Sequence, residues 1–207
     1  MLGNHGRSIT KAIFTPPARL LARMGVTPNM VTVVGTVVSI AIAVIALPLG
    51  YVWQGAIALG VVLFCDSVDG TLARMTTGGT PFGAFLDSTL DRLADGAVFA
   101  ALTAWVITGL PFSPWRTVAM TAGLAAIVGA GAVPYARARA ESIGVVAKLG
   151  IAERTDRLLI GLVAAAVTDF GWGDWWVAIG LSWVALASFI TVVQRIWFTA
   201  RELKARN

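Results

Sequence analysis

The sequence has 207 residues, of which 57% are hydrophobic and only 13% are charged, with a formal net charge of +5. So little charge cannot cover the surface of a soluble domain of this length, which excludes an ordinary soluble protein. The positive balance indicates contact with anionic lipid and not nucleic-acid binding.

The first element in chain order is a mixed segment at residues 8–24, where apolar side chains alternate with Lys11, Arg19 and Arg23. This composition predicts a short amphipathic helix lying in the headgroup zone of a membrane. A disordered basic tail is the alternative. The segment is not a cleaved signal peptide, because the first apolar run starts only near residue 30 and is too long for one.

Residues 30–49 contain no ionisable side chain, and a helix of that length spans the ~30 Å hydrocarbon core of a bilayer. Five further spans are predicted at 52–73, 85–108, 117–140, 156–170 and 175–198. We therefore expect an all-α integral membrane protein with six transmembrane helices. Its single domain covers residues 1–207, with an interfacial segment at 1–26, the helix bundle at 27–198 and a tail at 199–207.

The distribution of positive charge predicts the orientation of these spans. If both termini lie on one side, that side holds every Lys and Arg except Arg116. The loops on the other side are short and carry tryptophans. The positive-inside rule then places both termini in the cytoplasm.

Five of the eleven acidic residues fall between positions 66 and 95, inside or beside the predicted spans. A carboxylate inside a bilayer is costly and by default functional. Asp66 and Asp69 are three residues apart, and Asp87 and Asp91 are four apart, so each pair shares a helix face. A short connection with Gly78, Gly79 and Pro81 joins them, which predicts antiparallel neighbouring helices and four carboxylates near one membrane surface.

Four carboxylates in one place repel each other strongly, and only Arg74 and Arg92 are close in sequence to offset this repulsion. Divalent cations resolve it, and all-oxygen ligands favour Mg²⁺ or Mn²⁺ over zinc. Gly70, Ala73 and Gly83 leave space for a bulky group near the backbone. The alternative is that these small residues only allow helices to pack and that the aspartates pair with arginines structurally.

The string D-x-x-D-G-x-x-A-R-x8-G-x3-D-x3-D, from Asp66 to Asp91, resembles the signature of the CDP-alcohol phosphotransferases. The resemblance implies transfer of the phosphatidyl group of CDP-diacylglycerol to an alcohol, with release of CMP. It implies two metal ions, one on Asp66, Asp69 and Asp87 and one on Asp66, Asp87 and Asp91. It also implies that Asp91 is the general base, that the enzyme is a homodimer, and that it lies in a bacterial inner membrane with its active site facing the cytoplasm.

The resemblance also implies which residues contact the lipid donor. Thr27 and Pro28 have the pattern of a helix start, and Asn29 and Thr32 follow one turn apart, near the predicted metal centre. The residues implied to bind CDP-diacylglycerol are Asn29, Thr32, Gly70, Ala73, Arg74, Thr80 and Gly83.

A second polar concentration lies at residues 135–157 and favours a phosphorylated acceptor, because arginine side chains bind phosphate bidentately. The segments 135–141 and 150–154 resemble the actinobacterial members of the family that use inositol 1-phosphate. That resemblance implies that Arg137, Arg154 and Arg195 hold the acceptor phosphate, with Arg157 a further candidate. Glycerol 3-phosphate also carries a phosphate, so phosphatidylglycerol phosphate synthesis is the nearest alternative.

Two other classes of membrane protein remain as alternatives. A cation transporter would place its acidic site near the midplane, often on broken helices of repeated halves, and no repeat is present here. A purely structural subunit leaves four converging carboxylates without a reason. We expect Asp95, four residues after Asp91, to pair with a basic residue or to tune Asp91 and not to bind metal.

Overall fold

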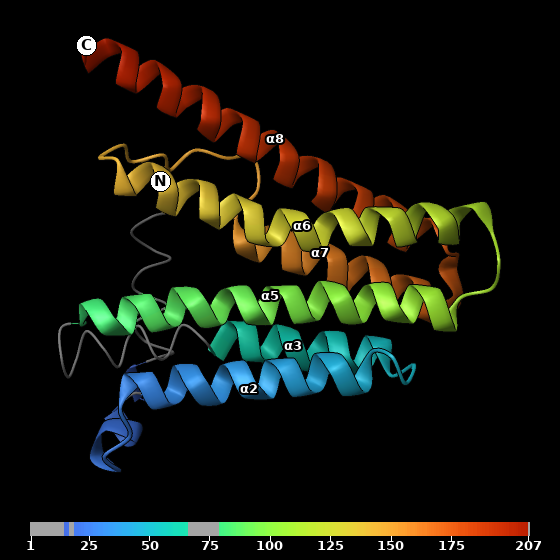
Figure 1. The fold of residues 1–207 in the computed structure, drawn as a ribbon. Coiled ribbons are helices and arrows are strands. Elements are labelled where there is room, and N and C mark those ends of the chain that lie inside the picture. Colours follow the sequence, from blue (N-terminus) through green and yellow to red (C-terminus); the bar gives the residue numbers. More distant parts are fainter. Residues whose placement is uncertain (1–14, 17–18, 66–78, 207) are drawn as a thin grey trace, which may run out of the picture.

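A computed structural model describes residues 15–16, 19–65 and 79–206, and every regular element in this part of the chain is helical (Figure 1). The helices are α2 (Pro28–Ala46), α3 (Val52–Cys65), α5 (Pro81–Gly109), α6 (Pro114–Ser142), α7 (Arg154–Val167) and α8 (Trp175–Arg206). A short π-helical segment, η1 (Thr168–Trp172), joins α7 to α8.

Three of the helices begin with the same sequence device, a hydroxyl residue followed by proline. Thr27, Thr80 and Ser113 each stand at the N-cap, and each side chain accepts a hydrogen bond from a backbone N–H of the first turn. The following proline has no N–H to lose and already has a helical φ. These caps fix where α2, α5 and α6 begin, and therefore where the residues of their first turns lie.

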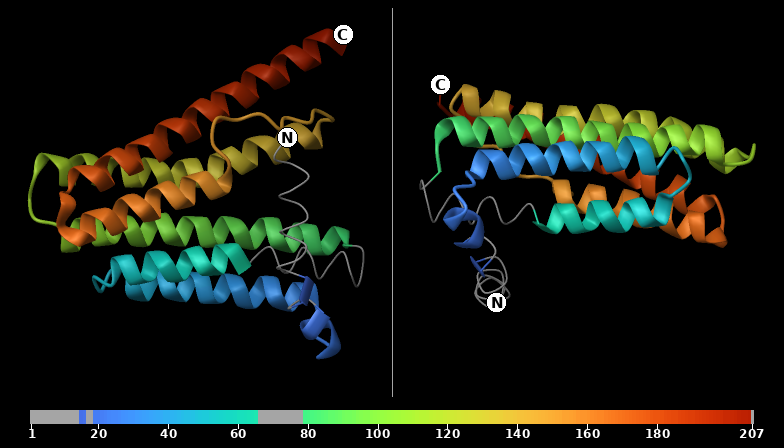
Figure 2. Two further views of the ribbon diagram at one scale, coloured as in Figure 1. Left: turned by 180° about the vertical axis from the view of Figure 1, so that it is seen from behind. Right: turned by 90° about the horizontal axis from the view of Figure 1, so that it is seen from below.

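The helices run side by side along one direction, with α8 leaning away from the others toward its carboxyl end (Figures 1 and 2). Helix α5 lies between α2 and α6, α6 packs against α8, and α7 contacts both α3 and α8. The amino-terminal ends of α2, α5 and α7 lie toward the same end of the bundle as the carboxyl-terminal ends of α6 and α8 (Figure 1).

Small residues bring these helices close together. A Cβ atom added to Gly129 of α6 would lie 2.5 Å from the Cβ of Ser188 on α8, and one added to Gly161 of α7 would lie 3.2 Å from Phe99 on α5. Glycine at such contacts is typical of helices that associate in a membrane, where close van der Waals contact replaces the hydrophobic effect. Phe99, Leu102 and Leu181 are among the fully buried side chains of the core.

The outer surface of α2 is apolar and exposed, including Val34, Val37 and Ile45. Large exposed apolar areas mark contact with membrane or protein. Three helices in the described part of the chain, α2, α6 and α8, are long and apolar enough to cross a bilayer. The chain is therefore of the membrane type, whereas a full set of six crossings stays a prediction.

Each predicted span overlaps a helix, but several bounds differ. Helix α7 ends at Val167, before the predicted limit of 170, because it passes into the π-helical η1 at Thr168. The chain turns only at Gly171, which has a φ of 85°. Helix α8 continues through the predicted tail to Arg206, whose Nη2 donates to the carbonyl of Gly144 at 2.9 Å. Of the predicted interfacial segment, residues 19–23 are helical, and 1–14 and 17–18 lie outside the described residues.

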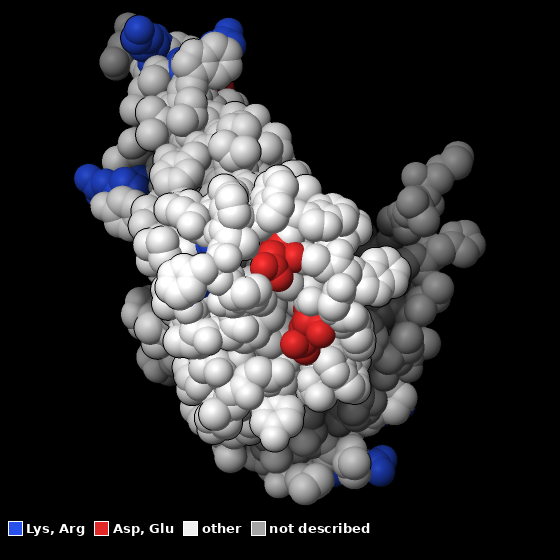
Figure 3. All heavy atoms as spheres, turned by 90° about the vertical axis from the view of Figure 1, so that its right-hand side faces the viewer, with Lys and Arg blue, Asp and Glu red and all other residues white. Residues whose placement is uncertain are grey.

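Figure 3 shows the end of the bundle that holds the loops after α2 and α5 and the η1 segment. This face is almost wholly uncharged, with small acidic areas, and the basic side chains in view lie at its margins. Its aspartates have structural contacts. Asp169 accepts from the backbone N–H of Trp53 at 3.1 Å, and Asp174 accepts from the hydroxyl of Ser113 at 3.4 Å.

Candidate active site

The first half of α5 carries three aspartates at intervals of four residues, so they share one face of the helix. The cap fixes the position of this face, because the Thr80 hydroxyl accepts from the N–H of Gly83 at 2.9 Å. Burial increases along the row. Asp87 is partly exposed, the Asp91 side chain is 19% exposed, and Asp95 is 1% exposed. The row therefore runs from the end of the bundle into its interior.

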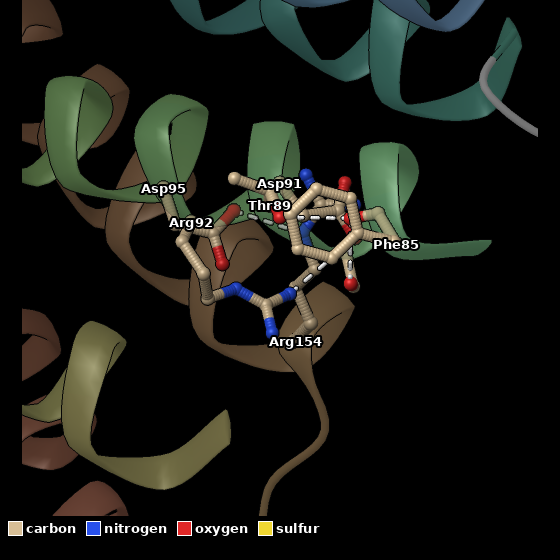
Figure 4. A network of polar contacts seen from close by, with 7 residues as sticks. Phe85, Thr89, Asp91, Arg92, Asp95 and Arg154 are labelled. Carbon is tan, nitrogen blue, oxygen red and sulfur yellow. Dashed lines mark hydrogen bonds and ion pairs between the residues drawn. The ribbon is translucent and has the colours of Figure 1, made fainter. Parts of the chain in front are cut away.

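Asp91 lies between two guanidinium groups (Figure 4). Its Oδ1 lies 2.9 Å from Nη1 of Arg154, and its Oδ2 lies 3.3 Å from Nη2 of Arg92. Arg92 is the next residue of α5, whereas Arg154 is the first residue of α7. The carboxylate is thus held as an anion by cations from two different helices.

Local contacts determine where Arg154 lies. The Asp156 carboxylate accepts from the backbone N–H of Glu153 at 2.9 Å and so defines the first turn of α7. The connection before it rests on α8, where the N–H of Ile151 donates to the Thr191 hydroxyl at 3.3 Å. Gly150 approaches Thr191 so closely that an added Cβ would lie 2.7 Å from its methyl group. Gly150 and Asp156 therefore both have structural reasons, and together they hold the chain on either side of Arg154.

Asp95 pairs with a basic residue, as the sequence predicted. Its Oδ1 accepts from Nε of Arg154 at 2.8 Å, so one arginine contacts Asp91 and Asp95 together (Figure 4). The role of Arg154 in this geometry is to bridge two carboxylates one helical turn apart. Asp91 and Arg154 also take part in further interactions.

The predicted metal ligands are described only in part. Asp66 and Asp69 lie outside the described residues, as do Gly70, Ala73 and Arg74. Asp87 and Asp91 share one face of α5, and both offer only oxygen atoms, which fit Mg²⁺ or Mn²⁺. Among the described residues no three His, Cys, Asp or Glu side chains form a metal-binding group. The residues present are compatible with a divalent ion, and the predicted four-carboxylate cluster stays a prediction.

Three residues expected to bind the lipid donor come together where α2 meets α5. A Cβ atom added to Gly83 would lie 3.1 Å from Oδ1 of Asn29 and 3.1 Å from Oγ1 of Thr80. Thr32 is buried one turn further along α2, and its hydroxyl donates to the carbonyl of Pro28 at 3.2 Å. Asn29, Thr80 and Gly83 thus form one polar corner at the start of α5, with Thr32 on the adjoining turn of α2.

A small recess opens beside this row of carboxylates, between α2, α3, α5 and α7. Asp91, Asp95 and Arg154 line one part of it and leucine and valine side chains line most of the rest. Thr36 and Ser39 of α2 also line it, and the sequence analysis did not single them out. Their spacing after Thr32, at four and seven residues, is a polar stripe on an otherwise apolar helix and is the signal that could have identified them.

The arginines expected to bind an acceptor phosphate are not joined by direct contacts. Arg137 pairs with Glu141 at 2.9 Å on the surface of α6. Nε of Arg195 donates to the Leu149 carbonyl at 3.0 Å, and its Nη1 donates to the carbonyl of Val133. Arg195 therefore has a structural role in joining α8 to α6 and to the following connection.

Arg157 is the most informative arginine of this group. Its side chain is 3% exposed, and its Nε and Nη1 have no hydrogen-bond partner within the described part of the chain. The charges of Asp95 and Arg154 act on Arg157, and the charge of Arg157 acts on Arg195. A buried guanidinium with unused donors favours a bound anion. In the sequence, only its spacing of three residues from Arg154 indicated that Arg157 could lie beside the site.

Comparison with known proteins identifies the family of this chain. The family model for CDP-alcohol phosphatidyltransferases matches residues 25–184, which covers α2, α3, α5, α6 and α7 and enters α8. The chain belongs to this family. It is therefore a phospholipid-synthesis enzyme, and the aspartates of α5 lie within the matched region.

Curated relatives of this CDP-alcohol phosphatidyltransferase are named phosphatidylinositol phosphate synthase. The protein from Corynebacterium glutamicum is 38% identical over 207 residues, covering 100% of this chain and 93% of its own length. The protein from Mycobacterium tuberculosis is 40% identical over 192 residues, covering 92% of this chain and 87% of its own length.

Solved structures agree with the fold of this CDP-alcohol phosphatidyltransferase. The crystal structure of Mycobacterium tuberculosis phosphatidylinositol phosphate synthase with CDP-DAG bound has a TM-score of 0.83 and 39% identity, and the match covers 91% of this chain and 94% of that one. A crystal structure of the same enzyme with manganese and citrate also has a TM-score of 0.83, covering 90% and 88% of the two chains.

Proposed function

We propose that this enzyme transfers the phosphatidyl group of CDP-diacylglycerol to a hydroxyl of inositol 1-phosphate. The products are phosphatidylinositol phosphate and CMP. The observation that carries this proposal is the position of Arg154, which brings a phosphate-binding side chain directly against Asp91 at 2.9 Å. An acceptor whose phosphate lies on that arginine has its hydroxyl within reach of the carboxylate.

In this proposal Asp91 is the general base. It takes the proton of the acceptor hydroxyl as that oxygen bonds to the phosphorus of the phosphatidyl group and the bond to CMP breaks. Asp91 is partly exposed, so a substrate can reach it, and Arg92 and Arg154 hold its carboxylate in place. A positioned carboxylate of this kind contributes about 10²–10⁴-fold to the rate of such a reaction.

Two divalent ions, Mg²⁺ or Mn²⁺, are proposed to bind Asp66, Asp69, Asp87 and Asp91. When bound, such ions neutralise the charge of the diphosphate and of the leaving CMP. The oxygen-only character of Asp87 and Asp91 supports this, as does the manganese present in the Mycobacterium tuberculosis crystal structure. Four carboxylates without cations would repel one another strongly.

The cytidine diphosphate end of the donor is proposed to lie at the corner formed by Asn29, Thr80 and Gly83, beside Thr32. There a glycine at the start of a helix allows close approach to the backbone. Gly70, Ala73 and Arg74 are proposed to complete this region. The CDP-DAG bound to the Mycobacterium tuberculosis enzyme supports a donor of this class.

The acceptor phosphate is proposed to bind Arg154, Arg137 and Arg195. The charge of Arg137 acts on Arg195, which supports a common cationic region although the two have separate contacts. Arg157 has unused donors and is added to this set on the basis of its burial. Several arginines match a phosphate better than they match a neutral alcohol.

We further propose that residues 1–207 form one domain with six membrane crossings, that both termini lie in the cytoplasm of a bacterial cell, and that the site opens to the cytoplasm. The apolar helices and the uncharged end of the bundle support this orientation (Figure 3). A homodimer is proposed from family resemblance alone.

The test is CMP release by the purified enzyme with CDP-diacylglycerol and Mn²⁺ or Mg²⁺, offered inositol 1-phosphate, free inositol or glycerol 3-phosphate in separate reactions. We expect turnover with inositol 1-phosphate and none with free inositol, because the latter lacks the group that arginines recognise. Chelation by EDTA should abolish turnover, and added Mn²⁺ or Mg²⁺ should restore it.

The alternatives give different outcomes. Preference for glycerol 3-phosphate would identify a phosphatidylglycerol phosphate synthase and overturn the proposed acceptor while leaving the carboxylate chemistry. If no CMP is released with any of the three alcohols, the proposed acceptor class is wrong. Activity that survives EDTA would contradict the metal requirement.

A further inference from the structure

Asp95 is the most deeply buried charged residue of the active-site region, yet it lies one turn beyond the carboxylates proposed to do the chemistry. It is 1% exposed, and its carboxylate binds Nε of Arg154 at 2.8 Å. Burying an aspartate in a membrane protein costs free energy, so a buried aspartate that is paired with a cation has a purpose beyond packing. Its direct partner is the arginine that also contacts Asp91.

The two faces of the Arg154 guanidinium have different surroundings. The Nε edge points to buried Asp95, and Nη1 points to the partly exposed Asp91 (Figure 4). The guanidinium is therefore anchored from its inner side and presents its outer nitrogens toward the region that substrates reach. Arg154 is also fixed at its backbone, because it is the first residue of α7 and the Asp156 contact defines that turn.

A phosphate monoester competes well for such a group. It carries about −1.5 to −2 charges near neutral pH and three acceptor oxygens, against one charge on a carboxylate. Arginine also binds phosphate through two parallel hydrogen bonds. An acceptor phosphate that approaches Arg154 therefore draws its outer nitrogens away from Asp91 while the Nε contact with Asp95 remains.

We propose that Asp95 is a positioning residue that holds Arg154 while the outer nitrogens of this arginine pass from Asp91 to the acceptor phosphate. This inference rests on the proposed function. Without acceptor, Nη1 of Arg154 pairs with Oδ1 of Asp91 and competes with water for that oxygen. With acceptor, the same arginine binds the phosphate and Asp91 becomes available to the acceptor hydroxyl.

The reaction that the ion pair suppresses is hydrolysis of the donor. In it a water oxygen bonds to the phosphorus of the phosphatidyl group, the bond to CMP breaks, and the water proton passes to Asp91 and then to solvent. The products are phosphatidate and CMP. A transferase that avoids this loss must keep its base inactive toward water until the alcohol is bound.

The experiment compares four variants of the full-length enzyme: Asp95→Asn, Arg154→Gln, the double variant with both changes, and Arg139→Gln. Arg139 is an exposed arginine of α6 whose side chain contacts Ser142, so it is a matched control for the loss of one positive charge. Phosphatidate formed without acceptor and phosphatidylinositol phosphate formed with inositol 1-phosphate are measured separately with CDP-diacylglycerol and Mn²⁺. Binding of inositol 1-phosphate without donor or metal is measured by calorimetry.

For Arg154→Gln we expect the ratio of donor hydrolysis to phosphatidyl transfer to rise about tenfold or more. For Asp95→Asn we expect the KM for inositol 1-phosphate to rise about tenfold, while the KM for CDP-diacylglycerol stays near the wild-type value. Arg154→Gln leaves Asp95 buried without its cation and can therefore prevent folding. The double variant removes both charges, so it carries the test if Arg154→Gln does not fold. The double variant should match Arg154→Gln, since Asp95 acts only through this arginine.

Variants that lose thermal stability but keep the wild-type ratio and the wild-type affinity for inositol 1-phosphate would show that the pair is structural, and would overturn the inference. So would a double variant that is much worse than Arg154→Gln, because Asp95 would then act independently. If the wild-type enzyme turns over only glycerol 3-phosphate, the proposed acceptor is wrong. The ratio of hydrolysis to transfer, measured with glycerol 3-phosphate, then tests the inference separately.

Discussion

Asp91 is the proposed general base, and its surroundings are consistent with a carboxylate in that role. Arg92 and Arg154 stabilise the anion from two helices, and Asp95 balances the second of these cations. The arrangement pairs a carboxylate near an apolar interior with opposite charges, which offsets the cost of burying it.

At this scale we predict that Asp91→Asn lowers phosphatidyl transfer by about 10²-fold or more, because asparagine cannot accept the acceptor proton. The measurement is CMP release at saturating substrates. Asp174→Asn, at the uncharged end of the bundle, is the control and should retain full activity. Transfer by Asp91→Asn within a few-fold of the wild type would assign the base to another residue.

The start of α5 is the element that organises the proposed donor site. Its cap at Thr80 and the glycine at position 83 bring the first turn of α5 against Asn29 of α2. The sequence identified this region through its glycine and its proline, because both have local conformational meaning. It could not show that Asn29 lies against Gly83, since that contact depends on how α2 and α5 pack.

For this element we predict that Gly83→Val raises the KM for CDP-diacylglycerol by about tenfold, about 1.4 kcal/mol, because the added methyl groups fill the corner where the donor is proposed to lie. The KM for inositol 1-phosphate should change little. The matched control is Gly60→Val on α3, where an added Cβ meets nothing within 4 Å. Equal effects of Gly83→Val on both KM values would argue for general distortion of the site.

The described part of the molecule is polarised from end to end. The start of α5, which precedes the aspartate row, and the basic last turns of α6 and α8 lie toward one end (Figure 1), and the face at the other end is almost uncharged (Figure 3). This polarity supports the proposed topology, because positively charged segments are retained in the cytoplasm. Helices α2, α6 and α8 have the length and composition to cross the bilayer.

The prediction at this scale concerns which end faces the cytoplasm. In a Cys65→Ser background, Trp172→Cys in η1 should react with a membrane-impermeant thiol reagent added to intact cells, whereas Lys204→Cys near the end of α8 should react only after the membrane is opened. Both positions are exposed in the structure, so access is decided by the membrane. The reverse pattern would place the site on the outer side.

Sequence alone located each described helix, because long apolar runs are a local signal. Of the hydroxyl-proline caps it used only the one at Thr27, and it placed the starts of α5 and α6 four and three residues too late. It also placed Asp87 and Asp91 on one face of a helix. It expected Arg154 near phosphate but not its bridge between Asp91 and Asp95, because that bridge joins α5 to α7 across 59 positions of sequence. The polar stripe of Thr36 and Ser39 was visible in the sequence but was not used, whereas the burial of Arg157 depends on packing and was not predicted.

Arg116 stands apart from the other cations at the uncharged end of the molecule. It donates to the carbonyls of Val106 and Ile107 in the last turns of α5, and its guanidinium lies 4.0 Å from the centre of the Phe112 ring. The carboxyl end of a helix carries partial negative charge and the face of an aromatic ring is also negative, so both groups balance the charge of Arg116. In the proposed orientation it is the positive residue that must be carried across the bilayer during biogenesis, and once there it fastens the loop that turns the chain back toward the cytoplasm.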